Sequence, residues 1–241
     1  MKKVLIILAA ALLCQTAFAQ SFSFEDGNVE PRGRSYSIVE FGSVGIFGFG
    51  YHIMQEGDAD FLAATPNFGA NREIFFNLSG VRLRPVKPLS LSVGVDLNWD
   101  NYRLQKQNFW LPDGAGKVSI ADLDAHPEYS SIKKSVLRSF GFDFPLMLTL
   151  HLGPVNVSGG VVGEFNFPGR TKFVAYDNGG AKIKNGSMRV KDIESHPFTY
   201  SYRASASAYG IGLYAKYSPC SQFMAGSGPQ FSYFTVGLIL E

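Results

Sequence analysis

The chain contains little cysteine, few charges of either sign and, after its N-terminus, no long hydrophobic run. Among its 241 residues there are 2 cysteines, and 17% of the residues are charged. Beyond the N-terminal segment, no stretch approaches the roughly 18 consecutive apolar residues of a transmembrane helix. The few cysteines exclude a disulfide-stabilised scaffold, and the near balance of charges argues against a protein that binds nucleic acid through its net charge.

The N-terminal segment has the features of an export signal. Two lysines precede an apolar run over residues 4–13, and the sequence Ala-Phe-Ala ends at Ala19. A charged end, an apolar stretch and an A-x-A site are typical of a cleavable secretory signal, so we expect cleavage after Ala19. The alternative is a lipoprotein anchor on Cys14, although the preceding Leu13 is larger than that motif prefers.

Removal of this signal changes both the charge and the cysteine content. The full chain has 22 Lys and Arg against 20 Asp and Glu, and the two lysines of the signal account for the difference. The mature chain is therefore formally neutral, and we expect no nucleic acid among its partners. Cys220 alone remains, so no intramolecular disulfide can form. We expect a signal peptide over 1–19, a polar N-terminal lead over 20–35 and one β-barrel domain over 36–241.

The rest of the chain is rich in strands with two unlike faces. Residues 89–100 read L-S-L-S-V-G-V-D-L-N-W-D, in which the odd positions are apolar and the even positions are small or polar. Since successive side chains of a strand point to opposite faces, this pattern predicts a strand with one apolar face. A bulge near Gly80 is expected to shift the phase of another strand. Similar patterns predict strands over 36–49, 74–84, 136–152, 155–167, 198–208, 211–217 and 234–240.

The connections between these strands alternate in length. Short turns are expected near Pro85, Gly153 and Gly210, and longer connections over 51–71, 105–134, 176–197 and 219–230. An even number of strands with this alternation indicates an all-β fold, an eight-stranded antiparallel up-and-down transmembrane β-barrel with short periplasmic turns and longer extracellular loops. The alternative is a soluble sandwich or a lipocalin-like barrel, which would carry its apolar faces inside.

The alternation assigns residues to the two faces of the barrel. The lipid-facing residues would be Leu91, Val93, Val95, Leu97, Phe140, Phe142, Phe144, Leu146 and Leu148. The lumen would hold Asp96, Asn98, Asp100, Asp143, Glu164, Arg203 and Lys216. An eight-stranded barrel is filled by its own side chains, so we expect these polar residues to form a structural plug rather than a pore. A proton or ligand site using the acids is the alternative. An interfacial aromatic girdle would contain Trp99, Tyr102, Phe109, Trp110, Tyr200 and Tyr202.

Several short segments carry a resemblance to a known family. They occur in the same order from about residue 36 to the end, over 94–102, 144–148, 159–163, 169–172, 213–218, 228–229 and 234–238. In them the chain resembles the Bacteroidetes outer-membrane β-barrel family that includes the PorT-like proteins. The resemblance implies an outer-membrane location, no catalytic motif and, for one class of members, an accessory role in type IX secretion. The chain departs from such barrels at its end, where Leu240 and Glu241 replace the usual terminal aromatic residue.

Three groups of loop residues could form a binding or catalytic site. His126 lies in an acidic loop over 122–128 that could hold a divalent cation, but its spacing matches no metal motif, so we expect a solvated loop and neither metal nor other cofactor. His196 with Ser195 and Asp192 could form a hydrolase triad, although no G-x-S-x-G signature supports one. A basic stretch could bind lipopolysaccharide phosphate or an acidic partner, or be an ordinary exposed hairpin end; it contains Lys182, Lys184, Arg189 and Lys191.

These observations together lead to an expectation about function. We expect a small, non-enzymatic, monomeric outer-membrane protein with a structural or protein-interaction role, and an accessory role in protein export is its most specific form. Its expected partners are outer-membrane lipid and other envelope or secretion proteins. One alternative is a rim-located lipid-modifying enzyme (a hydrolase or acyltransferase) or protease. Another is a surface protein whose loops bind ligands or mediate adhesion.

Overall fold

The computed structural model describes residues 39–42, 47–66, 69–86, 88–105, 107–184 and 193–240. Of these residues, 72% lie in strands and 5% in helices, so the prediction of an all-β fold is confirmed. The predicted signal peptide and polar lead lie outside the described residues, as do Arg189, Lys191, Asp192 and Glu241. Within the described part of the chain, no helix is both long enough and apolar enough to cross a membrane.

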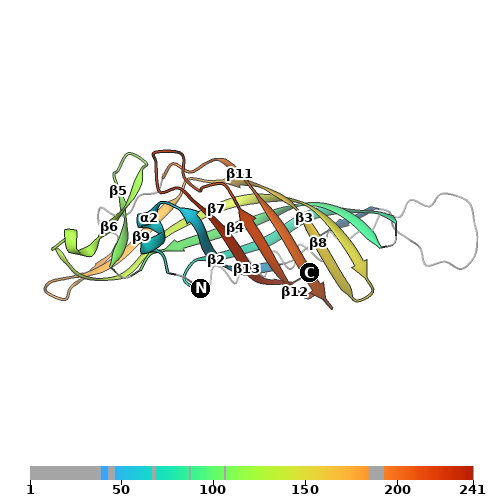
Figure 1. Cartoon of the computed structure of the whole chain (residues 1–241), viewed down its shortest axis with the longest axis horizontal. Helices are drawn as coiled ribbons and strands as arrows, with labels where there is room; N and C mark the ends of the chain where they lie inside the picture. Colours follow the sequence, from blue (N-terminus) through green and yellow to red (C-terminus); the bar gives the residue numbers. More distant parts are fainter. Residues whose placement is uncertain are drawn as a thin grey trace, which may run out of the picture.

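Eight antiparallel strands close a ring (Figure 1). In chain order they are β2 (Phe47–Gly57), β3 (Arg72–Val86), β4 (Leu89–Arg103), β7 (Tyr129–Leu152), β8 (Val155–Asn166), β11 (Phe198–Ala208), β12 (Ile211–Ser218) and β13 (Phe231–Leu240). Each pairs with the ring strands before and after it, and β13 pairs with β2 to complete the circle. The predicted closed antiparallel arrangement of eight strands is thus confirmed.

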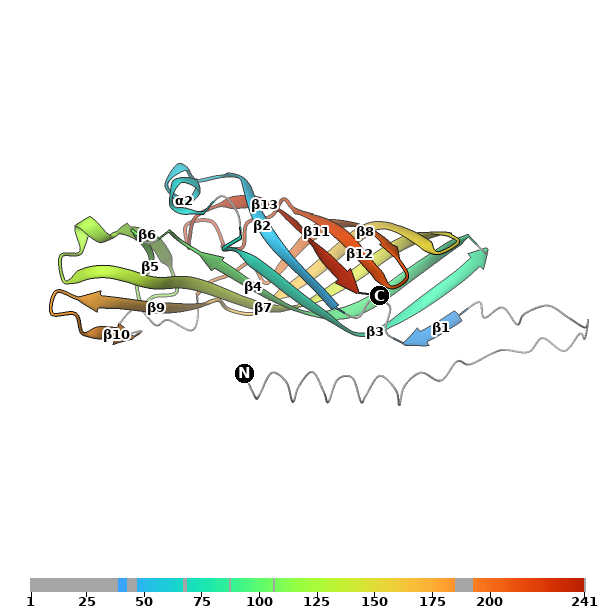
Figure 2. The same cartoon turned by 90° about the horizontal axis from the view of Figure 1, so that it is seen from below.

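The wall of the ring is uneven, because β7 has 24 residues and β12 has 8. The first part of β7 continues beyond the ring and pairs with β9 (Arg170–Asp177), which pairs with β10 (Lys182–Lys184). A hairpin of β5 (Asn108–Pro112) and β6 (Val118–Asp122), followed by the short helix η1 (Leu123–Ala125), lies beside this extension (Figures 1 and 2). We call these elements, with residues 129–138 of β7, the head.

Short and long connections alternate around the ring, as predicted. Turns of two residues join β3 to β4, β7 to β8 and β11 to β12, all at the end opposite the head. The long connections contain more structure than the sequence suggested. β2 runs on to Gly57 and is followed by helix α2 (Ala59–Ala64), and β7 begins at Tyr129 rather than near 136. The expectation of long loops over 51–71, 105–134 and 176–197 is therefore wrong in its boundaries, because these segments pair with, or pack against, distant parts of the chain.

The structure describes two parts of the first expected strand, over 36–49. β1 (Val39–Gly42) and the start of β2 both pair with β3, at Gly42↔Gly80 and Phe47↔Phe76, and residues 43–46 lie outside the described residues. Only β2 belongs to the ring, and β1 lies alongside the half of β3 nearer the short turns (Figure 2). The bulge expected near Gly80 is present as a register shift between Asn77 and Ser79.

The two faces of the wall differ in polarity. On β4 and β7 the apolar residues of the alternating pattern lie outside, where Val93 and Leu148 are about half exposed, while their polar neighbours are buried inside. The same arrangement continues over β8, β11, β12 and β13. It is the reverse of what the soluble alternative requires.

A buried apolar cluster closes the ring at the head end. It includes Phe61 of α2, Trp110 of β5, Phe223 of the last connection and Phe231 of β13. A second cluster, around Phe109, Ile132 and Phe173, fills the head. Tyr102, Phe109 and Trp110 are fully buried in these clusters, so their assignment to an interfacial girdle is wrong. The local pattern could not reveal this, because the burial comes from loops that fold back over the ring.

The turn between β11 and β12 leads to a first prediction. Tyr209 has φ 54 and Gly210 has φ 82, the combination that a type I′ hairpin requires and that Asn-Gly adopts best. A non-glycine residue in this region carries a cost of about 1 kcal/mol, which Asn reduces. We expect Tyr209→Asn to raise the free energy of unfolding in detergent by about 0.5–1 kcal/mol, measured by urea titration. Gly210→Ala should lower it; a destabilising Tyr209→Asn would contradict this view of the turn.

Candidate functional site

The interior of the ring is the largest buried polar region of the described chain. The seven residues assigned to the lumen from sequence are each at most 6% exposed. They come from five neighbouring strands, β4, β7, β8, β11 and β12, and they lie in three connected layers between the head and the short turns. Three further residues complete these layers, although the alternating pattern did not predict them in the lumen: Glu73, His52 and Tyr214.

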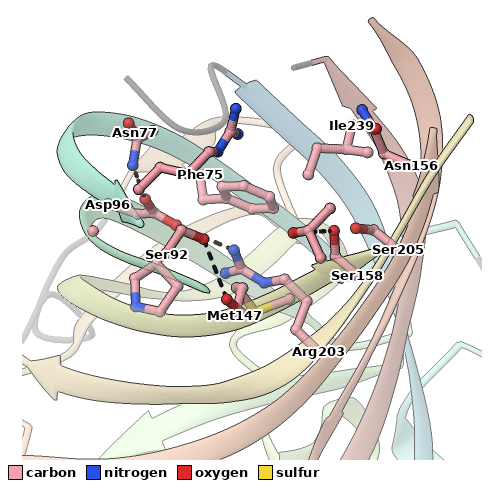
Figure 3. A pocket seen from close by; sticks show the side chains of 14 residues that line it. Phe75, Asn77, Ser92, Asp96, Met147, Asn156, Ser158, Arg203, Ser205 and Ile239 are labelled. Carbon is pink, nitrogen blue, oxygen red and sulfur yellow. Dashed lines mark hydrogen bonds and ion pairs between the residues drawn. The ribbon is translucent and has the colours of Figure 1, made fainter. Parts of the chain in front are cut away.

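The layer nearest the short turns is organised by Arg203. Its Nη1 lies 3.1 Å from Asp96 Oδ2, and its Nη2 lies 3.6 Å from Asp143 Oδ2. The guanidinium also lies over the ring of Phe75, 4.2 Å from its centroid. Asn77 Nδ2 donates to the other oxygen of Asp96 at 2.7 Å. Figure 3 shows the side chains of Arg203, Asp96, Asn77 and Phe75 converging from different strands, so a single guanidinium joins opposite walls of the ring.

The middle layer is organised by Lys216, which is fully buried. Its Nζ donates to Glu73 and lies 3.3 Å from Glu164 Oε1. Glu164 also accepts hydrogen bonds from Thr199 and Ser201, each 2.7 Å long. Every oxygen of Glu164 therefore has a donor, which is the condition for tolerating a buried carboxylate.

Two glycines make room for Tyr214, which donates a further hydrogen bond to Glu73. Tyr214 Oη donates to Glu73 Oε2 at 2.9 Å. A Cβ atom on Gly50 would lie 2.3 Å from the Tyr214 hydroxyl oxygen, and one on Gly237 would lie 2.6 Å from the Tyr214 ring. These two glycines let the tyrosine ring lie flat against the inner wall and reach the carboxylate.

The third layer lies below the apolar cluster at the head end. His52 Nδ1 is 2.8 Å from Thr235 Oγ1, and His52 Nε2 is 3.2 Å from Asp100 Oδ1. The imidazole stacks on Tyr102 with ring centroids 5.3 Å apart. Asn98 Nδ2 lies 3.3 Å from Asp100 and 3.5 Å from Asp143 and so links this layer to that of Arg203. The carboxylate–imidazole–hydroxyl sequence resembles a catalytic arrangement, but His52 is 1% exposed and closed off by the cluster above it.

The charges of the three layers are unequal in number. Among the described residues, the buried carboxyl groups inside the ring are those of Glu73, Asp96, Asp100, Asp143 and Glu164, whereas the buried permanent cations are Arg203 and Lys216. Each cation lies between two carboxylates. An unpaired buried charge is very unfavourable, so the structure depends on both cations. The arrangement is that of an internal scaffold which ties opposite strands together.

The alternating pattern of the sequence contains a signal for two of these three residues, Glu73 and His52. Glu73 continues the inward series of Phe75 and Asn77 one step before the expected strand. His52 follows Gly48 and Gly50 in an alternation with apolar residues that runs past residue 49. Extending both strands would have placed both side chains inside, but not opposite their partners.

A small cavity lies on the short-turn side of Arg203. Its volume is about 60 Å³, and small hydroxyl-bearing residues form much of its wall, among them Ser92, Thr149, Ser158 and Ser205 (Figure 3). Thr149 and Ser158 bond to each other at 2.9 Å. The space suits a few water molecules held by hydroxyl groups.

The loop candidates remain outside this region. His126 Nδ1 is 3.1 Å from Glu128 Oε1 at the surface. Hydrogen bonds from its own backbone N–H and from His126 lower the pKa of the exposed Glu128 carboxyl. Within the described chain, no group of three or more potential metal ligands occurs. Ser195 donates its hydroxyl hydrogen to the carbonyl of Ile193 at 3.3 Å rather than to an imidazole, and Asp192 lies outside the described residues.

Comparison with known proteins adds no relative: no family model, curated protein or solved structure matches the chain.

Proposed function

We propose that the protein is an integral outer-membrane β-barrel with a closed lumen, and that it acts through its outer wall and head rather than by conduction or catalysis. The observation that carries this proposal is the distribution of polarity between the two faces of the ring, which is the reverse of that in a soluble barrel. Apolar side chains are exposed on the outside, and ion-paired polar side chains are buried inside. A continuous exposed apolar wall is an aggregation hazard in water, whereas a bilayer covers it.

The backbone and the dimensions of the wall fit a bilayer. The closed ring pairs its strands on both sides, which lipid requires because it offers no partners for backbone N–H and C=O groups. Along β7, the step from Phe140 to Leu152 at about 3.3 Å per residue and a tilt of about 45° gives a height of about 28 Å. This is close to the apolar band of about 25 Å in outer-membrane barrels. The nine residues predicted to face lipid lie within this band.

The difference in length between the connections at the two ends suggests an orientation in the membrane. Outer-membrane barrels have short turns on the periplasmic side and longer connections outside the cell. We therefore place the turns at Gly153 and Gly210 in the periplasm and the head at the cell surface. The three polar layers and the apolar cluster would close the lumen to solutes.

The role we propose is structural or protein-interacting. The head projects beyond the ring and offers a surface of strands and loops to other envelope proteins (Figure 2). An accessory part in protein export, which the family resemblance suggests, is the more specific form of this proposal.

The test combines extraction, gel mobility and conductance. We expect the mature protein to fractionate with the outer membrane and to migrate faster on a gel before boiling than after it, because a closed barrel stays compact in detergent. Reconstituted into planar bilayers, it should give no steady conductance. Recovery in the soluble periplasmic fraction would contradict membrane insertion, and stable single-channel currents would contradict the closed lumen.

A further inference from the structure

The outer surface of the sheet where the ring joins the head carries a concentration of cations. Six of them come from four strands: Arg72 of β3, Arg103 of β4, Lys134 and Arg138 of β7, and Arg170 and Lys172 of β9. We call these six residues the basic face. Since the mature chain is expected to be neutral overall, this accumulation of one sign is local.

Strand register places these cations on the same side of the sheet. One row across the strands contains Arg72↔Asn101, Asn101↔Arg138 and Arg138↔Arg170. With neighbouring strands about 4.8 Å apart, the three arginines of this row span about 14 Å. All three are exposed.

A second and a third row follow at increasing distance from the short turns. The second contains Arg103↔Val136 and Val136↔Lys172, and the third contains Lys134↔Val174. Val174 also pairs with Lys184, an exposed residue of β10. The basic stretch noted in the sequence therefore adjoins a larger charged surface that only the sheet assembles.

Among the described residues, no neighbouring acid neutralises the charges of the basic face. The acids nearest in register, Glu73 and Asp100, point into the ring and are buried there. Within the described residues, no ion pair involves any of the six cations. Lys134 lies beyond the apolar band, and partial burial, followed by repulsion from Arg138, Lys172, Arg103 and Arg72, lowers its pKa. Mutual repulsion of this kind is relieved by a bound anion.

The surroundings of the basic face restrict the kind of anion. On its short-turn side the next row is apolar, with Ile74↔Trp99 and Trp99↔Phe140, and Phe167 stacks on Phe140 at 5.5 Å. Below this row the outer wall is apolar down to the turns. A ligand that satisfies both regions has an anionic head joined to a long apolar body.

We propose that the basic face binds the phosphorylated headgroup of a membrane lipid, whose acyl chains lie against the apolar wall below Trp99 and Phe140. This inference rests on the proposed membrane location. Arginine forks bind phosphate oxygens in pairs, and the three forks of the row Arg72, Arg138 and Arg170, spread over about 14 Å, offer more donors than the oxygens of one phosphate can use. The geometry therefore favours a headgroup with two phosphates, at the leaflet nearer the head.

The test uses the full mature protein in phosphatidylcholine nanodiscs that contain either diphosphoryl or monophosphoryl lipid A. Retained lipid is counted by native mass spectrometry after release from the discs. We expect selective retention of the diphosphoryl lipid, weakened by salt, and a loss of at least about tenfold in the triple variant Arg72→Gln, Arg138→Gln, Arg170→Gln. Lys117→Gln, which removes an exposed cation in the β5–β6 hairpin, should retain the lipid.

The outcomes separate the possible failures. Each variant is first checked for the gel shift of the folded barrel, and the single variant Arg138→Gln replaces the triple one if the latter does not fold. Equal retention by wild type and variant, or displacement of the lipid by an equimolar amount of inorganic pyrophosphate, overturns the lipid site. Failure of the wild-type protein to enter nanodiscs overturns the membrane proposal and this inference together, whereas normal insertion with unselective retention overturns this inference alone.

Discussion

Lys216→Met is expected to lower the free energy of unfolding by about 3–5 kcal/mol, the cost of removing one partner from a buried ion pair. Lys216 is fully buried and lies between Glu73 and Glu164. Methionine retains the length and apolar character of the lysine stem but removes the charge. The two carboxylates would then face each other inside the ring with no cation between them.

The measurement is urea unfolding of the refolded protein in detergent, followed by the gel shift and by tryptophan fluorescence. Lys117→Met is the matched control, because Lys117 is exposed in the head, and it should change stability by less than about 0.5 kcal/mol. A Lys216→Met variant as stable as the wild type would show that the middle layer is not held by charge.

A second variant distinguishes charge from packing. In the triple variant Lys216→Met, Glu73→Gln, Glu164→Gln, the negative charges are removed together with the positive one. Replacing a whole buried ion network by neutral groups is often tolerated. We therefore expect this variant to recover more than half of the loss. If it is less stable than Lys216→Met alone, the hydrogen bonds from Tyr214, Thr199 and Ser201 contribute more than charge pairing.

Trp110→Ala is expected to cost about 3–5 kcal/mol, the range found for truncating a buried aromatic residue. Trp110 is fully buried in the apolar cluster that closes the ring, and its Nε1 donates to the carbonyl of Tyr102 at 3.1 Å. Its ring lies 5.8 Å from Phe61 and 5.9 Å from Phe223. Because these three residues come from three different connections, their contact holds the connections over the lumen.

The chain provides its own control in its other tryptophan. Trp99 is 38% exposed on the outer wall, so Trp99→Ala should cost clearly less than Trp110→Ala in detergent unfolding. Limited proteolysis of the protein in vesicles should also show faster cleavage of the head connections in Trp110→Ala and unchanged cleavage in Trp99→Ala. Equal unfolding midpoints and equal cleavage rates for the two variants would contradict a closing role for the cluster.

The proposed membrane barrel and the proposed lipid site involve different parts of the same wall. The apolar band is continuous around the ring, whereas the basic face occupies only the part formed by β3, β4, β7 and β9. The extension of β7 beyond the ring creates this part, because its pairing with β9 adds a strand next to the band. The head would thus contribute to the proposed lipid site as well as to the apolar cluster that closes the ring.

Much of the ring could be predicted from the sequence, and the reason is local. Side chains alternate along a strand, so the residues of 89–100 determine by themselves that Val93 and Asp96 lie on opposite faces. The alternation of short and long connections likewise predicts which strand ends lie together at each end of the ring. The bulge near Gly80 followed from a change of phase within one strand.

The partners of the buried charges depended on tertiary structure. Lys216 meets Glu73 across 143 positions of sequence, and Tyr102 meets Tyr233 across 131. These contacts depend on the register of every strand between them and on closure of the ring, and no single segment encodes either. The same reason explains the buried Trp110 and the basic face. The amino-acid sequence alone determined which side chains share a face, because that is a property of one strand. Only the folded ring decided which side chains meet across the lumen, because that depends on all eight strands.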